Sequence, residues 1–334
     1  MKAVIVEKPG ELVVKDIPKP EPSENDILLK VRTASICNAT DVRILEGKAS
    51  GYLDHYPQIL GHEVNGEVIS HGSKVTGVRI GERIACYKMF GGFCEYVTID
   101  AREPFAKVPD EISDEEAPLC EMFHGSLICT IFPAYIKTWE KVLIIGQGPM
   151  GLVTSQCVKA LKAASIAAVD LYENRLEKAK EFGVGHIYNR SKMTAEQIAD
   201  RIKEEIGPID LSIMCIDVDK SPKRDAGYLA TSVLRHGGRL TGLSVEAKEE
   251  GPQIDIQTIF QKNLVVAREL QNIYDSSASI SQAWQQGVNW VREGIVNLKA
   301  LISAHVSLED VHRGLMLCKN KPDETIKVVV HIGV

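Results

Sequence analysis

Short hydrophobic runs separated by turn-forming residues occupy the chain from residue 1 to about residue 110. The runs KAVIVE, DILLKVRTAS, VNGEVI and GERIACY are rich in β-branched residues, and Gly, Pro, Asn and Asp punctuate the segments between them. Runs of this length and composition are typical of β-strands, and the residues between them are typical of turns. The pattern therefore predicts that the first part of the chain is rich in β-structure.

A different pattern begins at about residue 140 and continues to about residue 270. Short apolar runs (KVLIIG, SIAAVD, LSIMCID, GGRLTGLS, NLVVARE) alternate with helical spacing in segments such as GLVTSQCVKALKAA and NRLEKAKEFG. Because parallel strands need a crossover to return the chain, this alternation predicts a doubly wound parallel sheet with helices on both faces. The last 60 residues predict two more helices, SISQAWQQGVNWVREG and LEDVHRGLMLC, and a closing strand, TIKVVVHI.

Composition narrows the class of protein. A chain of 334 residues with 44% hydrophobic and 25% charged residues is expected to fold as two globular domains. Its net charge of -6 and the lack of a basic run interleaved with aromatic residues argue against nucleic acid as a partner. The N-terminal segment lacks the apolar core of a secretion signal, and no stretch approaches the length of a membrane span. We therefore expect a cytoplasmic protein without membrane contact, whose eight cysteines form no disulfide framework.

A glycine-rich turn stands between the first predicted strand of the parallel sheet and the helix after it. Its sequence is G-Q-G-P-M-G, formed by Gly146, Gln147, Gly148, Pro149, Met150 and Gly151. In a dinucleotide-binding turn the first glycine allows a tight bend, the second lets a pyrophosphate approach the backbone, and the third allows the helix to pack closely. The alternative interpretation is a glycine turn that serves packing alone. The flanking strand and helix favour the dinucleotide.

The identity of the dinucleotide depends on two residues after the next strand. Asp170 ends that strand, 19 residues past Gly151, where a carboxylate accepts hydrogen bonds from ribose hydroxyls and repels a 2′-phosphate. This position favours NAD over NADP. Arg175 follows five residues later, and its guanidinium could instead bind a phosphate or stack on adenine.

The β-rich part contains the residue types of a catalytic zinc site. Cys37 precedes His62 by 25 residues, Glu63 follows in the segment GHEVNGEV, and Glu121 lies 59 residues beyond His62. Thiolate, imidazole and carboxylate are the mixed donors of catalytic zinc, in which three protein ligands leave one position open. Each residue by itself is more typical of a structural role.

The order of motifs along the chain resembles the zinc-containing medium-chain dehydrogenase/reductase family, in particular its sorbitol and threonine dehydrogenase-like branch. The similarity runs from MKAVI through GHE-xx-GxV, GERI, EYV, GxGPxG and LISAHVSLEDV to the terminal KVVV. It implies an α/β protein with a GroES-like β-rich catalytic domain at residues 1–124 and 273–334. A doubly wound Rossmann domain would then occupy residues 125–272.

The resemblance also implies roles for individual residues. Cys37 and His62 would bind the catalytic zinc, and Glu63 would either ligate it or stand behind it. The third ligand would be Glu121 or Cys120, and the similarity of the surrounding segment to the polyol branch favours Glu121. His124 would be a packing residue or lie behind the ligands.

Proton transfer and bracing would fall to the residues after Cys37. Thr40 would accept the substrate proton, and Asp41 would brace the site. Here three residues separate Cys37 from Asp41 where the family usually has two, and Arg43 stands where many members have a histidine that passes the proton to solvent.

The expected reaction is hydride transfer between a secondary alcohol, such as a polyol, sugar or amino alcohol, and NAD. Only Cys86 and Cys94 occupy the interval in which many relatives carry four cysteines for a structural zinc, so we expect one catalytic zinc per chain.

Gln271 and Asn272 are candidates to contact substrate hydroxyls. We expect an alcohol or ketone as substrate, in a homodimer or homotetramer. The alternatives are a zinc-free quinone or enone reductase of the same fold and a catalytically inactive NAD-binding regulatory protein.

Overall fold

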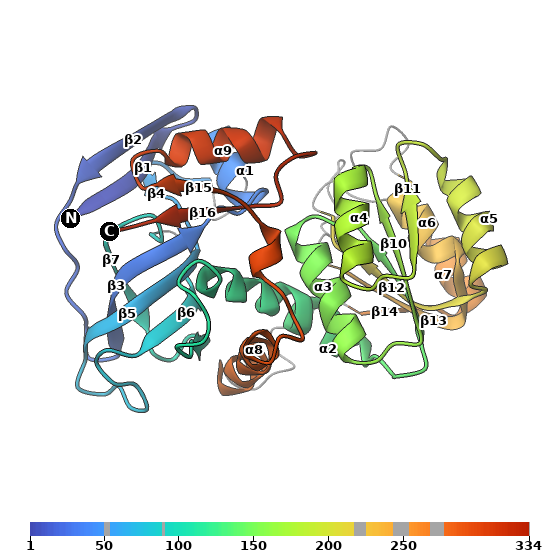
Figure 1. Cartoon of the computed structure of the whole chain (residues 1–334), viewed down its shortest axis with the longest axis horizontal. Coiled ribbons are helices and arrows are strands. Elements are labelled where there is room, and N and C mark those ends of the chain that lie inside the picture. Colours follow the sequence, from blue (N-terminus) through green and yellow to red (C-terminus); the bar gives the residue numbers. More distant parts are fainter. Residues whose placement is uncertain (50–53, 89–90, 217–224, 243–253, 268–276, 334) are drawn as a thin grey trace. The chain divides into compact units, whose positions relative to one another are not determined.

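The chain divides into two compact units. A computed structural model describes residues 1–49, 54–88, 91–216, 225–242, 254–267 and 277–333. The first unit combines Met1–Glu121 with Asp275–Val334, and the second comprises Met122–Tyr274 (Figure 1). The first unit is therefore assembled from both ends of the chain.

The first unit is built on two sheets. One has three strands in the order β2-β1-β4, and the other has seven strands in the order β15-β16-β3-β5-β6-β8, with β7 also paired to β3. All pairs in the larger sheet are antiparallel except β15 with β16. The strands are β1 (Lys2–Lys8), β2 (Glu11–Asp16), β3 (Asp26–Ser35), β4 (Gln58–Ile59), β5 (Glu63–His71), β6 (Arg83–Tyr87), β7 (Tyr96–Asp100), β8 (Phe105–Lys107), β15 (Ile302–Ser307) and β16 (Lys327–His331).

Helices flank these sheets in the first unit. They are α1 (Thr40–Leu45), the short 3₁₀ segments η2 (Ala117–Glu121) and η4 (Lys299–Leu301), α8 (Ser277–Arg292) and α9 (Val311–Asn320). The long strand β3 lies at the centre, between β5 and β16, and seven of its ten residues are buried. A single apolar core includes Leu29, Val64, Val311 and Val328, so the C-terminal strand and helix complete the core of the N-terminal strands.

The second unit is a parallel sheet of six strands in the order β11-β10-β9-β12-β13-β14. Its first strand in sequence therefore lies in the middle, and the chain reverses direction across the sheet between β9 and β12. In such sheets ligands bind beyond the carboxyl ends of the strands at this reversal. The strands are β9 (Lys141–Ile145), β10 (Ser165–Asp170), β11 (His186–Asn189), β12 (Ile209–Met214), β13 (Leu234–Gly242) and β14 (Val265–Val266).

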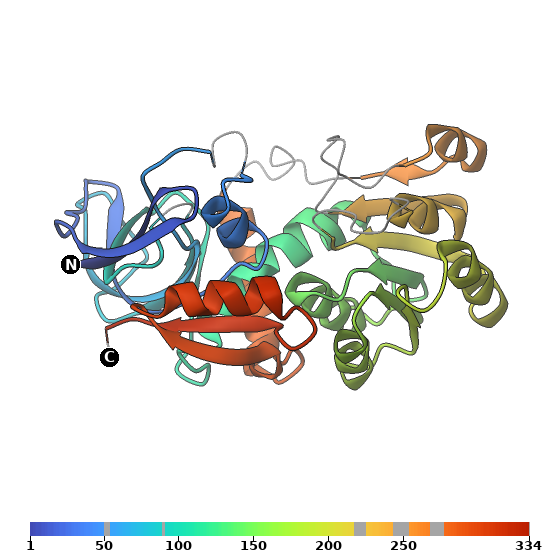
Figure 2. The ribbon, with the colours of Figure 1, turned by 90° about the horizontal axis from the view of Figure 1, so that it is seen from above.

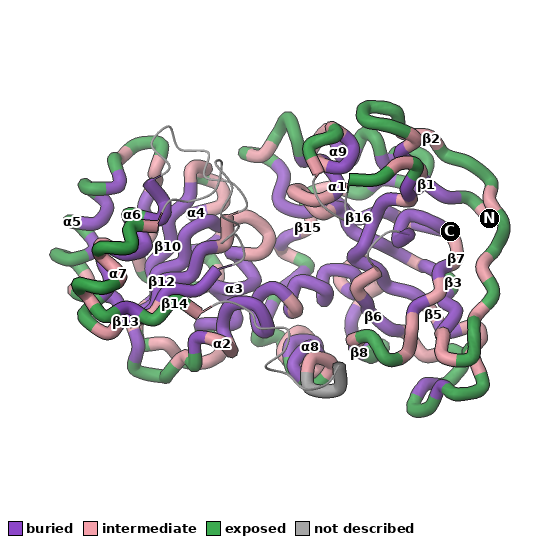
Figure 3. The backbone as a smooth tube through the Cα atoms, turned by 180° about the vertical axis from the view of Figure 1, so that it is seen from behind, coloured by how far each residue is buried: buried purple, intermediate pink, exposed green. Residues whose placement is uncertain are grey.

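Helices cover both faces of this sheet. Helices α3 and α4 pack together, and α6 packs against both α5 and α7 (Figures 1 and 2). The strand interiors are almost continuously buried, as expected for a parallel sheet that is covered on both faces (Figure 3). The helices are the π-helix η3 (His124–Ile131), α2 (Phe132–Ala134), α3 (Pro149–Ala160), α4 (Glu173–Glu181), α5 (Ala195–Glu205), α6 (Ala226–Ser232) and α7 (Ile256–Lys262).

The predicted fold class is confirmed. A β-rich unit and a separate doubly wound parallel sheet are both present, and the predicted strand DILLKVRTAS coincides with β3. The predicted strand NLVVARE is a strand only over Val265–Val266, and its last two residues, 268 and 269, lie outside the described residues. Within the described residues, no helix has both the length and the apolar character needed to cross a membrane.

A charged network anchors the turn that leads into η2. Asp114 accepts hydrogen bonds from Arg83 Nη1 at 2.7 Å, Asn65 Nδ2 at 3.1 Å and Arg32 Nη1 at 3.1 Å. Its carbonyl oxygen accepts a further bond from Thr33 Oγ1. These donors come from β3, β5 and β6, so one carboxylate ties the turn to three neighbouring strands.

We expect Asp114→Asn to lower the free energy of unfolding at neutral pH by about 1.5–3 kcal/mol, the range for hydrogen bonds to a charged group. Burial alone raises the pKa of Asp114, but the hydrogen bonds from Arg83, Asn65 and Arg32 outweigh it and lower the pKa. The stabilisation is therefore present above the ordinary carboxyl pKa of about 4 and is lost as pH falls through the lower pKa of the folded state.

Urea unfolding of the two proteins between pH 7 and pH 3 measures this effect. The difference between wild type and Asp114→Asn should shrink toward pH 3, while a control substitution of the exposed Asp323→Asn should have little effect at any pH. An equal difference at every pH would contradict the assignment.

Candidate functional site: a buried charged cluster and a glycine-rich turn

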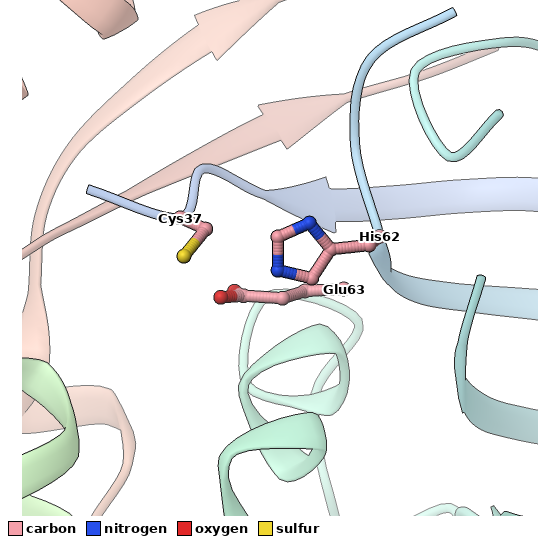
Figure 4. A group of neighbouring side chains, drawn as sticks. All are labelled: Cys37, His62 and Glu63. Atoms are coloured by element: carbon pink, nitrogen blue, oxygen red, sulfur yellow. The ribbon is translucent and has the colours of Figure 1, made fainter. Parts of the chain in front are cut away.

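Three potential metal ligands meet in the first unit. One donor atom each from Cys37, His62 and Glu63 lies within 4.8 Å of the other two (Figure 4). The sulfur of Cys37, the carboxylate of Glu63 and one ring nitrogen of His62 point toward a common space. His62 and Glu63 are buried, and Cys37 is half-buried. The structure thus brings together three of the four residues that the sequence nominates as metal ligands.

The register of the large sheet produces this convergence. Ser35, the last residue of β3, pairs with Glu63, the first residue of β5. Cys37 lies just beyond the end of β3, and His62 lies just before the start of β5. Because the two strands are antiparallel, the end of one and the beginning of the other lie side by side, and residues 25 positions apart become neighbours.

A buried lysine completes the cluster. Lys327 Nζ donates to Glu63 Oε1 at 2.6 Å and to the Ile36 carbonyl at 2.9 Å, and the other carboxylate oxygen of Glu63 accepts a hydrogen bond from Ser35 Oγ. Burial lowers the pKa of Lys327, but the negative charges of Glu63 and Cys37 outweigh burial and raise it. The ammonium therefore stays charged and holds the Glu63 carboxylate in place.

Lys327 was not among the residues nominated from the sequence. It stands in the apolar strand KVVVHI, where a lysine at the start of a strand is normally solvent-exposed. Val329 pairs with Ser35 in antiparallel register, which places Lys327 beside the segment that carries Cys37. The sequence offers no signal for this pairing, because β3 and β16 are separated by almost the whole chain.

Asp41 lies against both Cys37 and His62. Its Oδ2 accepts the backbone N–H of Cys37 at 2.8 Å, and its Oδ1 lies 3.6 Å from His62 Nδ1. The other ring nitrogen of His62 faces the Cys37 sulfur and the Glu63 carboxylate (Figure 4). A carboxylate behind a ligating histidine fixes the orientation of the ring in metal sites. The unusual spacing is accommodated because α1 begins at Thr40 and places Asp41 one helical turn from Cys37.

Glu121 and Cys120 differ in their surroundings. Glu121 is buried, and burial together with the nearby negative charge of Glu63 raises its pKa to about 7. It lies close enough to Glu63 and His62 to sense their charges, although it is not part of the group within 4.8 Å. The Cys120 thiol is directed at the Glu116 carbonyl, at 3.9 Å, and burial raises its pKa.

The chemistry of this cluster fits a bound cation. The cluster contains three buried carboxylates, those of Asp41, Glu63 and Glu121, besides the Cys37 sulfur, whereas Lys327 is the one buried lysine or arginine among the described residues. Burial lowers the pKa of His62, but the charges of Cys37 and Asp41 outweigh it and raise the pKa well above the usual value. The cluster attracts positive charge, and Asp41 Oδ1 has no hydrogen-bond partner among the described residues. Buried negative charge is stable only when it is paired or coordinates a metal.

The other residues that the sequence predicts to act at this site lie on helices or outside the described residues. Thr40 is half-buried at the first position of α1, three residues beyond Cys37, and Arg43 is half-buried on the same helix. His124 opens η3 in the second unit, where its Nδ1 lies 4.0 Å from Cys129 Sγ. Gln271 and Asn272 lie outside the described residues.

Cys86 and Cys94 are buried thiols in the interval where many relatives carry four cysteines. Burial raises the pKa of each to about 12, and the Cys94 thiol donates to the Gly91 carbonyl at 2.9 Å.

The glycine-rich turn joins β9 to α3 in the second unit. Gly146 has a φ of +92°, and a Cβ there would lie 2.7 Å from the Cys215 carbonyl oxygen. A Cβ on Gly151 would lie 1.8 Å from the Gly146 carbonyl oxygen. Pro149 opens α3, and Met150 Sδ accepts a hydrogen bond from Ser126 Oγ at 3.2 Å.

Gly148, unlike Gly146 and Gly151, has open space where a side chain would lie. Among the described residues, only Arg175 Nη1, at 3.7 Å, would lie within 4 Å of a Cβ on Gly148. Packing within the protein therefore explains Gly146 and Gly151 but not Gly148. A glycine with open space at a helix N-terminus permits close approach of an anionic ligand to the backbone amides.

Asp170 and Arg175 flank this turn. Asp170 is buried at the end of β10, where Oδ2 accepts the backbone N–H of Gln147 at 2.6 Å and Oδ1 accepts that of Tyr172 at 2.9 Å. The Arg175 guanidinium stacks over the Tyr172 ring at 4.7 Å from its centre. The carboxylate thus connects the glycine-rich turn to the neighbouring strand, and a cationic group lies beside Gly148.

Comparison with known proteins agrees with this arrangement. The model of the alcohol dehydrogenase GroES-like domain matches residues 23–110, and that of the zinc-binding dehydrogenase matches residues 149–293. L-threonine 3-dehydrogenase from Vibrio parahaemolyticus is 29% identical over 94% of each chain. Sorbitol dehydrogenase from Ovis aries is 28% identical over 92% of this chain and 90% of its own.

The solved structures show the same fold. Galactitol-1-phosphate dehydrogenase from Escherichia coli superposes with a TM-score of 0.83 at 23% identity, covering 99% of this chain and 100% of its own. The two domain models together span most of the sequence, and both relatives align over nearly all of it. The chain therefore belongs to the zinc-containing medium-chain dehydrogenase/reductase family, in its threonine and sorbitol dehydrogenase-like branch, and is an oxidoreductase of the alcohol dehydrogenase type.

Proposed function

We propose that the protein is a zinc-dependent dehydrogenase that transfers hydride from a secondary alcohol to NAD, with a polyol, sugar or amino alcohol as substrate. The observation that carries this proposal is the convergence of Cys37, His62 and Glu63 in a buried cluster that is rich in negative charge. A zinc-free reductase of the same fold has no need to bury these side chains together.

Cys37, His62 and Glu121 are the residues that we assign to the metal. Glu63 accepts one hydrogen bond at each carboxylate oxygen, from Lys327 and from Ser35, and each oxygen keeps a lone pair, so Glu63 either ligates the metal or supports the site from behind. When bound, zinc supplies a Lewis acid that lowers the pKa of the alcohol hydroxyl. Because the pKa of Glu121 is raised, its carboxyl group ionises readily at neutral pH only when a cation lies nearby. This is the behaviour of a ligand that loses its proton when the metal binds.

The chain itself supplies orientation and proton transfer. Asp41 holds the Cys37 backbone by a hydrogen bond, and its other carboxylate oxygen faces the His62 ring at 3.6 Å, where we expect it to orient the ring. Thr40 is the residue to which we assign acceptance of the substrate proton, at Oγ1. Burial of the cluster limits the access of water and strengthens the electrostatic interactions within it.

NAD is the cofactor that the second unit favours. The Asp170 carboxylate at the end of β10 repels a 2′-phosphate and has free lone pairs for ribose hydroxyls. We assign Arg175, which lies beside Gly148, to the pyrophosphate or to the adenine.

The substrate class follows from the branch of the family. The names of the two relatives indicate their substrates. One is L-threonine, which carries an amino group beside its hydroxyl, and the other is sorbitol, a polyol. Both compounds carry a secondary hydroxyl beside a second polar group. We therefore propose a substrate of this kind rather than a simple primary alcohol.

Removal of zinc should abolish activity. We expect the chelator-stripped enzyme, and separately Cys37→Ser, to lose at least about 100-fold in kcat/KM, because loss of a ligand should exceed the roughly 10–100-fold cost of removing a residue behind it. The assay is NAD reduction with a panel of secondary alcohols, polyols and vicinal amino alcohols, with metal content measured in parallel.

Cys94→Ser is the matched control, since this buried thiol lies outside the cluster and a serine can replace its hydrogen bond. Turnover of quinones or enones that survives stripping and Cys37→Ser would establish the zinc-free reductase instead. Binding of NAD without turnover of any alcohol would establish the inactive regulatory protein.

The identity of the third ligand can be tested separately. We expect Glu121→Gln to weaken zinc binding roughly 100-fold or more, since it removes a charged donor, and Cys120→Ser to retain the metal. Equilibrium dialysis with metal analysis measures the affinity of each variant. Loss of zinc from Cys120→Ser with retention by Glu121→Gln would reverse the assignment.

Cofactor preference should depend on the charge of Asp170. We expect Asp170→Asn to shift the ratio of kcat/KM for NAD over NADP toward NADP by about tenfold, because a like-charge contact near a protein surface costs about 1–4 kcal/mol. Asp200→Asn, an exposed carboxylate on α5, is the control and should leave the ratio unchanged. A wild-type preference for NADP would contradict the proposal.

A further inference from the structure

A second group of potential metal ligands lies in the first unit. Among the described residues outside the Cys37 cluster, Glu115, His305 and His331 are the side chains whose donor atoms lie within 4.8 Å of one another. His305 Nδ1 is 3.1 Å from His331 Nε2, and Glu115 Oε1 is 3.6 Å from the first and 3.7 Å from the second. All three side chains are accessible to solvent, with exposed fractions of 46% for His305, 33% for His331 and 39% for Glu115.

The sheet positions the two histidines. Strands β15 and β16 are parallel, and His305 pairs with Val329, two residues before His331. Since side chains alternate along a strand, His331 and the partner of His305 lie on the same face. The two rings are tilted by 37° with their centres 5.3 Å apart.

The turn before η2 supplies the carboxylate. Glu115 follows Asp114, whose carbonyl accepts a hydrogen bond from Thr33 and whose side chain is held by two arginines and Asn65. Thr33 in turn pairs with His331 between β3 and β16. The ligand from the turn and the ligand from the strand are therefore attached to the same place in the sheet.

The spacing of the donor atoms is that of a coordination sphere. Two atoms bound to zinc at 2.0–2.2 Å in a tetrahedron lie about 3.3–3.6 Å apart, and the three measured separations bracket this range. The two imidazoles lie at hydrogen-bond distance from each other, whereas the two carboxylate–imidazole distances are too long for hydrogen bonds. The carboxylate thus faces both ring nitrogens without bonding to either.

We propose that Glu115, His305 and His331 form a second, solvent-accessible site for a divalent transition metal of the zinc class. Two imidazoles and one carboxylate are donors that suit zinc, cobalt, nickel and copper, and three protein ligands leave a position for water. The ion would be additional to the single zinc expected from the sequence. It would join β15 and β16 to the turn that leads into η2, the segment that ends at Glu121.

Cobalt titration of the metal-free, full-length enzyme separates the two sites. Cobalt bound to Cys37 produces a thiolate-to-metal charge-transfer band, whereas cobalt bound by Glu115, His305 and His331 has no sulfur ligand and cannot. We expect the wild type to bind a second cobalt equivalent that adds no charge-transfer absorption. In the double variant His305→Gln/His331→Gln this second equivalent should be lost, while the charge-transfer band is retained.

Two further variants strengthen the test. Glu115→Gln should weaken the second equivalent roughly tenfold or more, and His312→Gln, which alters an exposed histidine on α9, should leave it unchanged. In a Cys37→Ser background, added zinc should raise the melting temperature unless His305 and His331 are also replaced, because a ligand that binds only the folded state stabilises it.

The outcome that overturns the proposal is equally specific. If the double variant and the wild type bind the same number of cobalt ions with the same affinities, the three side chains do not form a site. The same conclusion follows if Cys37→Ser abolishes all metal binding. Neither result depends on whether the enzyme oxidises an alcohol, so this proposal and the proposed function can fail independently.

Discussion

The requirement to pair buried charge organises the first unit of this protein. Glu63 and Lys327 come from opposite ends of the chain and form an ion pair in which both side chains are at most 3% exposed. An unpaired charge at this depth would cost several kcal/mol, so the β16–β3–β5 register must be kept for both groups to remain ionised. The same register sets Cys37 and His62 beside the pair. The candidate metal site is therefore a consequence of how the sheet buries its charges.

In the second unit, the candidate binding site is formed mainly by the backbone of the glycine-rich turn rather than by charged side chains. Gly146 and Gly151 allow β9 and α3 to approach closely, and Gly148 leaves the amides at the start of α3 open to a ligand. Asp170 connects this turn to the end of β10 through two backbone N–H groups. One unit thus concentrates negative charge, and the other leaves the start of a helix open beside Gly148. The proposed use of zinc and a dinucleotide requires both features.

Local patterns predicted much of the arrangement. The glycine-rich turn and Asp170 could be found because their spacing reflects contacts between adjacent elements of the chain. Cys37, His62 and Glu63 could be found because their order resembles a family motif. Lys327, and the group of Glu115, His305 and His331, had no such signal. Their partners lie up to 291 residues away, and each residue type is common on surfaces and strands.

The sequence by itself determined the two kinds of secondary structure, the parallel topology of the second unit and the residues able to bind metal and dinucleotide. Hydrophobic periodicity and turn residues act over a few positions, so they can be read without coordinates. Only the tertiary structure decided how Asp41 reaches Cys37 and His62 despite the extra residue, why Glu63 is held by a lysine, and which two histidines meet a glutamate. Strand register and burial set these contacts, and both arise from packing between segments that are distant in the chain.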